Sequence, residues 1–67
     1  MRGWLKSMRE SAGLSKTALA KEVGAHLSVI GKYEAGIRTP KRKRAKKIAE
    51  VLGFDWTRFY EDEDGQQ

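Results

Sequence analysis

Residues 16–35 constrain the fold more than any other stretch, because two helical patterns meet there at a single glycine. Apolar side chains fall on one face of a helix before Gly24 and on one face of a second helix after it, at Leu19, Ala20, Val23, Val29, Ile30 and Tyr33. Glycine adopts a positive φ at little cost, so Gly24 is placed to end the first helix and turn the chain. The small Ala20 allows a close approach, and the branched Ile30 packs the second helix onto the first. The stretch therefore predicts two short helices joined by a tight turn.

The rest of the chain continues the helical pattern, and the sequence shows neither a strand pattern nor an internal repeat. Apolar spacing and stop signals predict five helices, at about residues 2–12, 16–23, 27–34, 40–52 and 56–60. We expect Ser15 to cap the second helix, Thr39 with Pro40 to begin the fourth, and Asp55 to cap the last.

A chain of 67 residues is expected to form one domain with a small core, here residues 1–60, followed by an acidic disordered tail at residues 61–67. It has no cysteine, which excludes disulfides and thiolate metal sites and agrees with a reducing, cytoplasmic location. A signal peptide is not expected, because residues 1–6 have no apolar signal region, and no apolar run approaches the roughly 20 residues that span a membrane. A membrane-surface helix is also not expected, because the basic helix has its own core-facing stripe.

Positive charge is concentrated in one part of the chain. The net charge is +5, and seven of the 14 cations lie between residues 38 and 47. Four of the nine acids lie in the tail, so residues 1–60 alone carry a net charge of +9. A small body this basic attracts polyanions, of which nucleic acid is the most common.

The basic run Lys41-Arg42-Lys43-Arg44 conflicts with a local rule. It occupies the first turns of a predicted helix, where the helix dipole favours acids over cations. Such a conflict marks a candidate functional site, and contact with phosphates would compensate for it. Two other interpretations stay open: a solvated helix face and a nuclear-localisation signal.

The chain resembles the Cro/cI-type (XRE) helix-turn-helix DNA-binding domains over about residues 4–60. The resemblance rests on matches at the family's spacing, at Leu5, Met8, Arg9, Gly13, Leu14, Ser15, Leu19, Ala20, Val23, Gly24, Ile30, Tyr33, Glu34, Gly36, Pro40, Ile48, Ala49, Leu52 and Gly53. It implies an all-α fold, a compact bundle of four to five helices of the phage-repressor-like helix-turn-helix type. In such a fold the second helix of the motif enters the major groove of DNA.

The resemblance also assigns roles to the helix expected at residues 27–34. Its exposed N-terminal part would face base edges through His26, Leu27, Ser28, Gly31 and Lys32. Lys32 can donate to guanine O6 or N7, Ser28 can bond to either base type, and Leu27 can pack on a thymine methyl. The alternative is that these residues are only solvent-exposed.

Phosphate contacts are expected from cations on the neighbouring helices and loops, namely Lys16, Arg38, Lys41, Arg42, Lys43 and Arg44. Lys16 stands where the family usually has a Gln that touches a phosphate, and a solvated lysine is the alternative. Arg9 and Glu34 match a partly buried ion pair that ties the first helix to the third, which makes them structural residues.

Three positions depart from the family's pattern. The family commonly has a long polar side chain where this chain has Gly31, Asn where it has Ala35, and a Ser or Thr cap where it has His26. Glycine at position 31 is expected to weaken the helix by roughly 1 kcal/mol.

We expect Trp56, Phe59 and Tyr60 to form the contact between two copies, because such domains usually act as two-fold dimers on near-palindromic sites. No cofactor and no metal are expected, since His26 has no second ligand in sight. The sequence also offers no set of nucleophile, base and orienting residue, so we do not expect an enzyme.

Together these patterns predict a sequence-specific regulator of transcription that binds double-stranded DNA, is repressor-like and acts as a homodimer. The alternative is a protein-interaction module on the same fold, such as an antitoxin or a bridging factor, which the acidic tail and the aromatic side chains would suit. No sensor domain is apparent, so a regulatory protein partner is one expected source of a signal.

Overall fold

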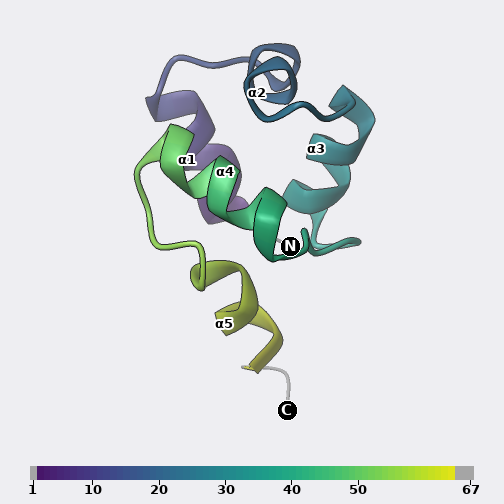
Figure 1. Cartoon of the computed structure of the whole chain (residues 1–67), viewed down its shortest axis with the longest axis vertical. Coiled ribbons are helices and arrows are strands. Elements are labelled where there is room, and N and C mark those ends of the chain that lie inside the picture. Colours follow the sequence, from purple (N-terminus) through teal and green to yellow (C-terminus); the bar gives the residue numbers. More distant parts are fainter. Residues whose placement is uncertain (1, 65–67) are drawn as a thin grey trace.

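The computed structural model describes residues 2–64, which form five helices and no strand (Figure 1). The helices are α1 (Gly3–Ser11), α2 (Lys16–Val23), α3 (Leu27–Ala35), α4 (Arg42–Leu52) and α5 (Arg58–Asp64). The predicted all-α class is therefore confirmed, with five helices. In this part of the chain no helix is long and apolar enough to cross a membrane.

The turn between α2 and α3 has the predicted geometry. Gly24 ends α2 in the left-handed region, with φ of 70°, and Ser15 caps the start of α2 by accepting a hydrogen bond from the Ala18 N–H at 3.0 Å. Leu19 of α2 and Ile30 of α3 are completely buried between the helices. Figure 1 shows α2 nearly end-on at the top of the molecule, with α3 below it and to its right.

The core draws apolar side chains from all five helices, at Leu5, Leu19, Ala20, Val23, Ile30, Tyr33, Ala45, Ile48 and Phe59. An aromatic cluster extends it, in which the rings of Trp4, Phe54 and Phe59 lie with their centroids 5.2 to 5.5 Å apart. Phe59 has no exposed surface. The expectation that Phe59 contacts a second copy is therefore wrong, because its ring is used to hold α5 against α1.

The start of α4 differs from the sequence-based expectation. Lys41, not Thr39, is the N-cap residue, and its side chain makes no capping hydrogen bond. Thr39 Oγ1 instead accepts a hydrogen bond from Arg2 at 2.6 Å, and the Pro40 carbonyl accepts one from the Tyr60 hydroxyl at 2.9 Å. Long-range contacts thus fix the loop before α4.

The C-terminal segment also differs. We expected the tail to be disordered from residue 61, but α5 continues to Asp64. Residues 65–67, the rest of the predicted tail, lie outside the described residues. Before α5, Asp55 Oδ1 accepts a hydrogen bond from the Thr57 N–H at 3.0 Å, as predicted for a cap, and this bond lowers the pKa of Asp55.

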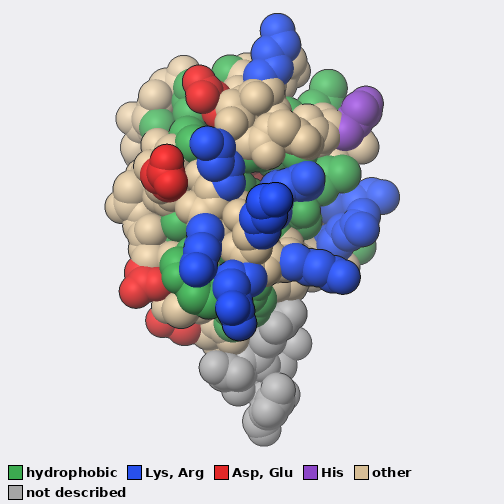
Figure 2. All heavy atoms as spheres, in the orientation of Figure 1, with side chains coloured by type: hydrophobic (Ala, Val, Ile, Leu, Met, Phe, Trp, Pro, Cys, Tyr) green, Lys and Arg blue, Asp and Glu red, His purple; other side chains and the backbone are tan. Residues whose placement is uncertain are grey.

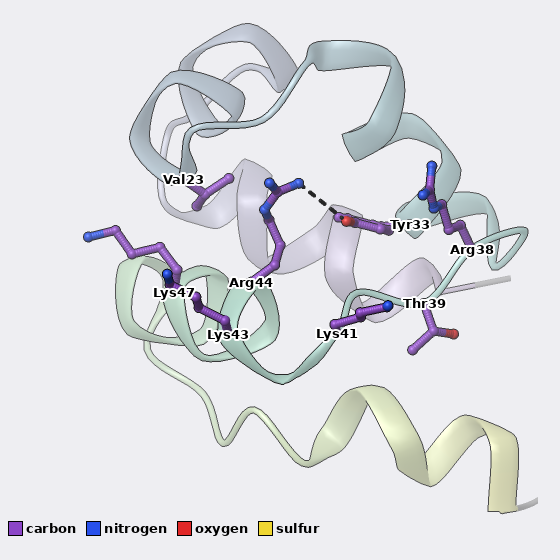
Figure 3. Close-up of a pocket in the computed structure, with 8 residues that line it drawn as sticks. All are labelled: Val23, Tyr33, Arg38, Thr39, Lys41, Lys43, Arg44 and Lys47. Atoms are coloured by element: carbon purple, nitrogen blue, oxygen red, sulfur yellow. Dashed lines mark hydrogen bonds between the residues drawn. The ribbon is translucent and has the colours of Figure 1, made fainter.

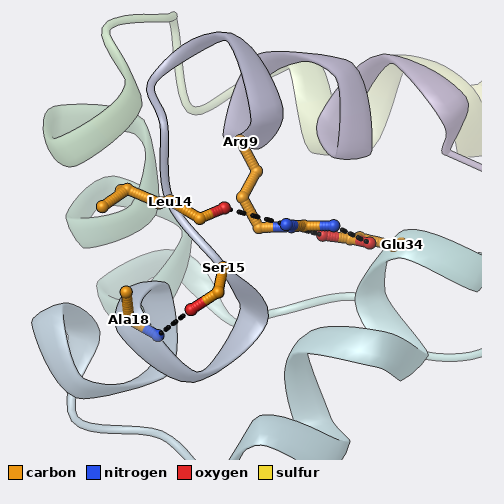
Figure 4. A network of polar contacts seen from close by, with 5 residues as sticks. All are labelled: Arg9, Leu14, Ser15, Ala18 and Glu34. Atoms are coloured by element: carbon orange, nitrogen blue, oxygen red, sulfur yellow. Dashed lines mark hydrogen bonds and ion pairs between the residues drawn. The ribbon is translucent and has the colours of Figure 1, made fainter.

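A buried ion pair joins α1 to α3 (Figure 4). Arg9 Nε donates to Glu34 Oε2 at 2.6 Å, and Arg9 Nη2 donates to Glu34 Oε1 at 3.4 Å. Arg9 Nη1 donates to the Leu14 carbonyl at 2.8 Å, which also fixes the loop between α1 and α2. The hydrogen bond with Glu34 raises the pKa of Arg9, and burial opposes this shift.

We expect Arg9→Ala and Glu34→Ala each to lower the free energy of unfolding by about 3 kcal/mol or more, because each leaves a buried charge without its partner. The double substitution should lose less than the sum of the two single losses. Urea unfolding of the four proteins measures this coupling. Glu22→Ala, which removes an exposed carboxylate on α2, is the control and should change the stability by less than about 0.5 kcal/mol. Strictly additive losses would contradict an energetic coupling between Arg9 and Glu34.

Candidate nucleic-acid interface

The outer face of α3 carries the residues expected to read bases. Ile30, Tyr33 and Glu34 turn inward and are buried. The opposite side of the helix exposes His26, Leu27, Ser28 and Lys32, while Gly31 is half-buried. The structure therefore brings the five candidate residues together on one surface.

His26 takes the capping role at the start of α3 that the family gives to Ser or Thr. Its Nδ1 accepts a hydrogen bond from the Ser28 N–H at 3.2 Å and lies 2.9 Å from the Ser28 hydroxyl oxygen. An Nδ1 atom that accepts a hydrogen bond carries no proton, so in the neutral ring the proton is on Nε2. The exposed side of the ring therefore offers a hydrogen-bond donor.

A basic hollow of about 720 Å³ lies between the end of α2, α3 and α4 (Figure 3). We call it the α4 hollow; it is lined by Val23, Tyr33, Arg38, Thr39, Lys41, Lys43, Arg44 and Lys47. Arg44 Nη1 donates to the Tyr33 hydroxyl at 3.5 Å, which aims the guanidinium toward α3. Five cations with no acid among the lining residues make this hollow suited to an anion.

A smaller hollow of about 190 Å³ lies on the other side of α3. We call it the Lys16 hollow; it is lined by Arg2, Gly3, Lys6, Lys16, Gly31, Glu34 and Ala35. Its carboxylate, Glu34, is paired with Arg9, so the charge of the hollow comes from Arg2 and the two exposed lysines. The outer face of α3 is thus flanked by a basic hollow on each side.

Five of the six cations expected to touch phosphates line one of these hollows. Lys16 lines the smaller one, and Arg38, Lys41, Lys43 and Arg44 line the larger one. Arg42 does not: its guanidinium carbon lies 6.0 Å from the ring centroid of Trp56. Lys47, which the sequence analysis left out, lines the α4 hollow one turn after Lys43, a spacing that the sequence does show.

Charge is unevenly distributed over the surface. Figure 2 shows Lys and Arg side chains over α4 and toward the α3 side, while the visible acidic side chains lie toward the other edge. A surface with this distribution of charge attracts polyanions to its basic side.

Arg2 was not singled out by the sequence, yet it fixes the loop that carries Arg38. It is 3% exposed, and its guanidinium donates to the carbonyls of Tyr33 at 2.8 Å and Arg38 at 3.0 Å. The Arg2 N–H donates to the Glu34 carbonyl at 2.7 Å. Carbonyls at a helix C-terminus lack partners within the helix, and Arg2 supplies them for α3. Nothing in the residues next to Arg2 in the sequence signals this role.

Comparison with known proteins agrees with this geometry. The family model for helix-turn-helix domains (HTH_3) matches residues 5–59. The chain belongs to the helix-turn-helix family. It is 42% identical over 62 residues to a protein of Bacillus subtilis (strain 168) named "Uncharacterized HTH-type transcriptional regulator YqaF", across 92% of this chain and 82% of that protein. No solved structure gives a significant match.

We expect His26→Ala to destabilise this helix-turn-helix domain by about 1 kcal/mol, because the Ser28 N–H loses the acceptor that caps α3. His26→Ser should recover most of the loss, since a serine hydroxyl is a good N-cap acceptor. Thermal unfolding of the three proteins tests this. Equal stabilities of the Ser and Ala variants would show that the imidazole does not stabilise α3 as a cap.

Proposed function

We propose that this domain binds double-stranded DNA at specific sequences and regulates transcription, in the simplest case by occupying a promoter as a repressor does. The main support for this proposal is the position of α3, whose exposed face lies between two basic hollows. A helix in the major groove has a phosphate backbone on each side, and the groove is about 12 Å wide, enough for one helix.

The two hollows divide the phosphate contacts between the two strands. The Lys16 hollow, with Lys6 on its α1 side, faces one backbone, while Lys43, Lys47 and the loop around Arg38 face the other. These contacts fix the register of the protein on the duplex and carry no sequence information by themselves. Base reading is then left to the exposed residues at the start of α3 and to Lys32, its longest donor.

We further propose that two copies bind one site through the surface formed by Trp56 and Tyr60. Their rings meet edge to face with centroids 5.8 Å apart, and both side chains are half-buried in the single chain. Arg42 and Lys46 lie over Trp56, and Glu61 is exposed beside Tyr60, so the surface carries both signs of charge. Such a surface can meet its own copy across a two-fold axis.

The salt dependence of DNA binding tests the backbone contacts. We expect Lys43→Gln with Lys47→Gln to weaken binding to all duplexes alike and to flatten the slope of log K against log salt by up to about 0.9 per lost contact. Binding to specific and random duplexes would be measured at several salt concentrations by fluorescence anisotropy.

The matched control is Lys21→Gln with Arg58→Gln, which removes the same charge from exposed positions that line neither hollow and lie outside the surface of Trp56 and Tyr60. It should leave the slope nearly unchanged. Equal slopes for both double variants would contradict contact at the α4 hollow. A wild-type protein whose binding to duplex DNA does not depend on salt would instead favour the protein-interaction module.

The proposed dimer predicts two chains on a duplex that carries two half-sites about 34 Å apart. We expect wild-type binding there to be cooperative, and Trp56→Ala to remove the cooperativity while a single half-site is bound as before. Sedimentation velocity gives the stoichiometry, and thermal unfolding confirms that the variant is folded. A single chain on every duplex would contradict the dimer.

A further inference from the structure

The side chain of Lys16 reaches from α2 to the middle of α3. If Gly31 carried a Cβ atom, its nearest heavy atom outside the local backbone would be Lys16 Nζ, at 3.9 Å. Both residues line the Lys16 hollow. The ammonium group therefore lies beside α3 at the one position of that helix where a side chain is missing.

The strip of α3 next to Lys16 has no hydrogen-bond donor of its own. Leu27, Gly31 and Ala35 follow one another at four-residue spacing, so they share this face of the helix. None of their side chains can donate or accept a hydrogen bond. Lys16 thus brings a donor from α2 to a part of the reading helix that lacks one.

Gly31 leaves this placement open, because a side chain longer than alanine that was directed toward Lys16 would compete with the ammonium group for the same space. At 3.9 Å a Cβ atom would make an ordinary contact with Nζ, so alanine fits. The γ and δ atoms of such a side chain would enter the hollow that Gly31 and Lys16 both line. The glycine is therefore compatible with this position of the lysine, although the two residues are 15 positions apart in the sequence.

We propose that Lys16 is a specificity-determining residue, which reads an acceptor on a base edge, such as guanine O6 or N7, through the gap at Gly31. This inference rests on the proposed DNA-binding function and goes beyond a phosphate contact at the start of α2. Lys6, which lines the same hollow from α1, is left to face the phosphate.

Selection of bound sites from a random duplex pool tests the proposal. Lys16→Met keeps the length of the side chain and removes its charge. It should lose a guanine preference at one base pair in each half-site by about tenfold or more. The matched control, Lys6→Met, should lower the affinity for all sequences by one common factor and leave the selected site unchanged.

Substitution of Gly31 tests the same proposal independently of Lys16. Gly31→Leu fills the gap without adding a donor, so it should remove the same preference, and combining it with Lys16→Met should cause no further loss at that base pair. Gly31→Ala should keep the preference. Thermal unfolding identifies any variant that fails to fold.

A uniform loss of affinity in Lys16→Met, with the selected site unchanged, would overturn the proposal and leave Lys16 as a phosphate contact. Independent losses from Lys16→Met and Gly31→Leu would also overturn it, because the two residues would then act separately. A wild-type protein that selects no sequence would instead contradict the proposed function itself.

Discussion

The buried ion pair between Arg9 and Glu34 is the interaction on which the position of α3 depends. It joins α1 to the last turn of α3, and Arg2 bonds to the carbonyls at the same end of that helix. A domain of this size buries only a small core, and α3 itself is short and contains a glycine. Two arginines from the N-terminal segment therefore hold the C-terminal half of α3, while its N-terminal half remains exposed for contact with a ligand.

The cations at the start of α4 show how the fold reduces an electrostatic conflict without removing it. Arg42 lies over Trp56, and Arg44 donates to the Tyr33 hydroxyl, so both find polar or aromatic partners away from the positive end of the helix dipole. Lys41 and Lys43 stay exposed on the α4 hollow, with no acid in the first turn of the helix. The remaining repulsion is what a bound phosphate backbone would relieve.

The sequence predicted those features that depend on local spacing. The turn at Gly24, the cap at Ser15 and the inward face of α3 follow from rules that span a few residues. It could not place Arg2 or the ring of Phe59, because Arg2 bonds to Tyr33 and Phe59 packs on Trp4, and each of these two contacts joins residues more than 30 positions apart. The sequence also could not relate Lys16 to Gly31. Each residue departs from the family's pattern at its own position, and only the short distance between them in the fold connects the two departures.

His26 shows how closely the stability of α3 and its chemistry are linked. The backbone N–H of Ser28 uses the acceptor nitrogen of the ring, so only a donor is left on the exposed side. That side can bond to phosphate oxygens, to guanine O6 or N7 and to thymine O4, but not to the amino groups of adenine or cytosine. Lys32 is subject to the same restriction, since an ammonium only donates. If α3 reads bases as proposed, it would favour acceptor-rich base edges, because of how the helix is capped as well as which side chains it exposes.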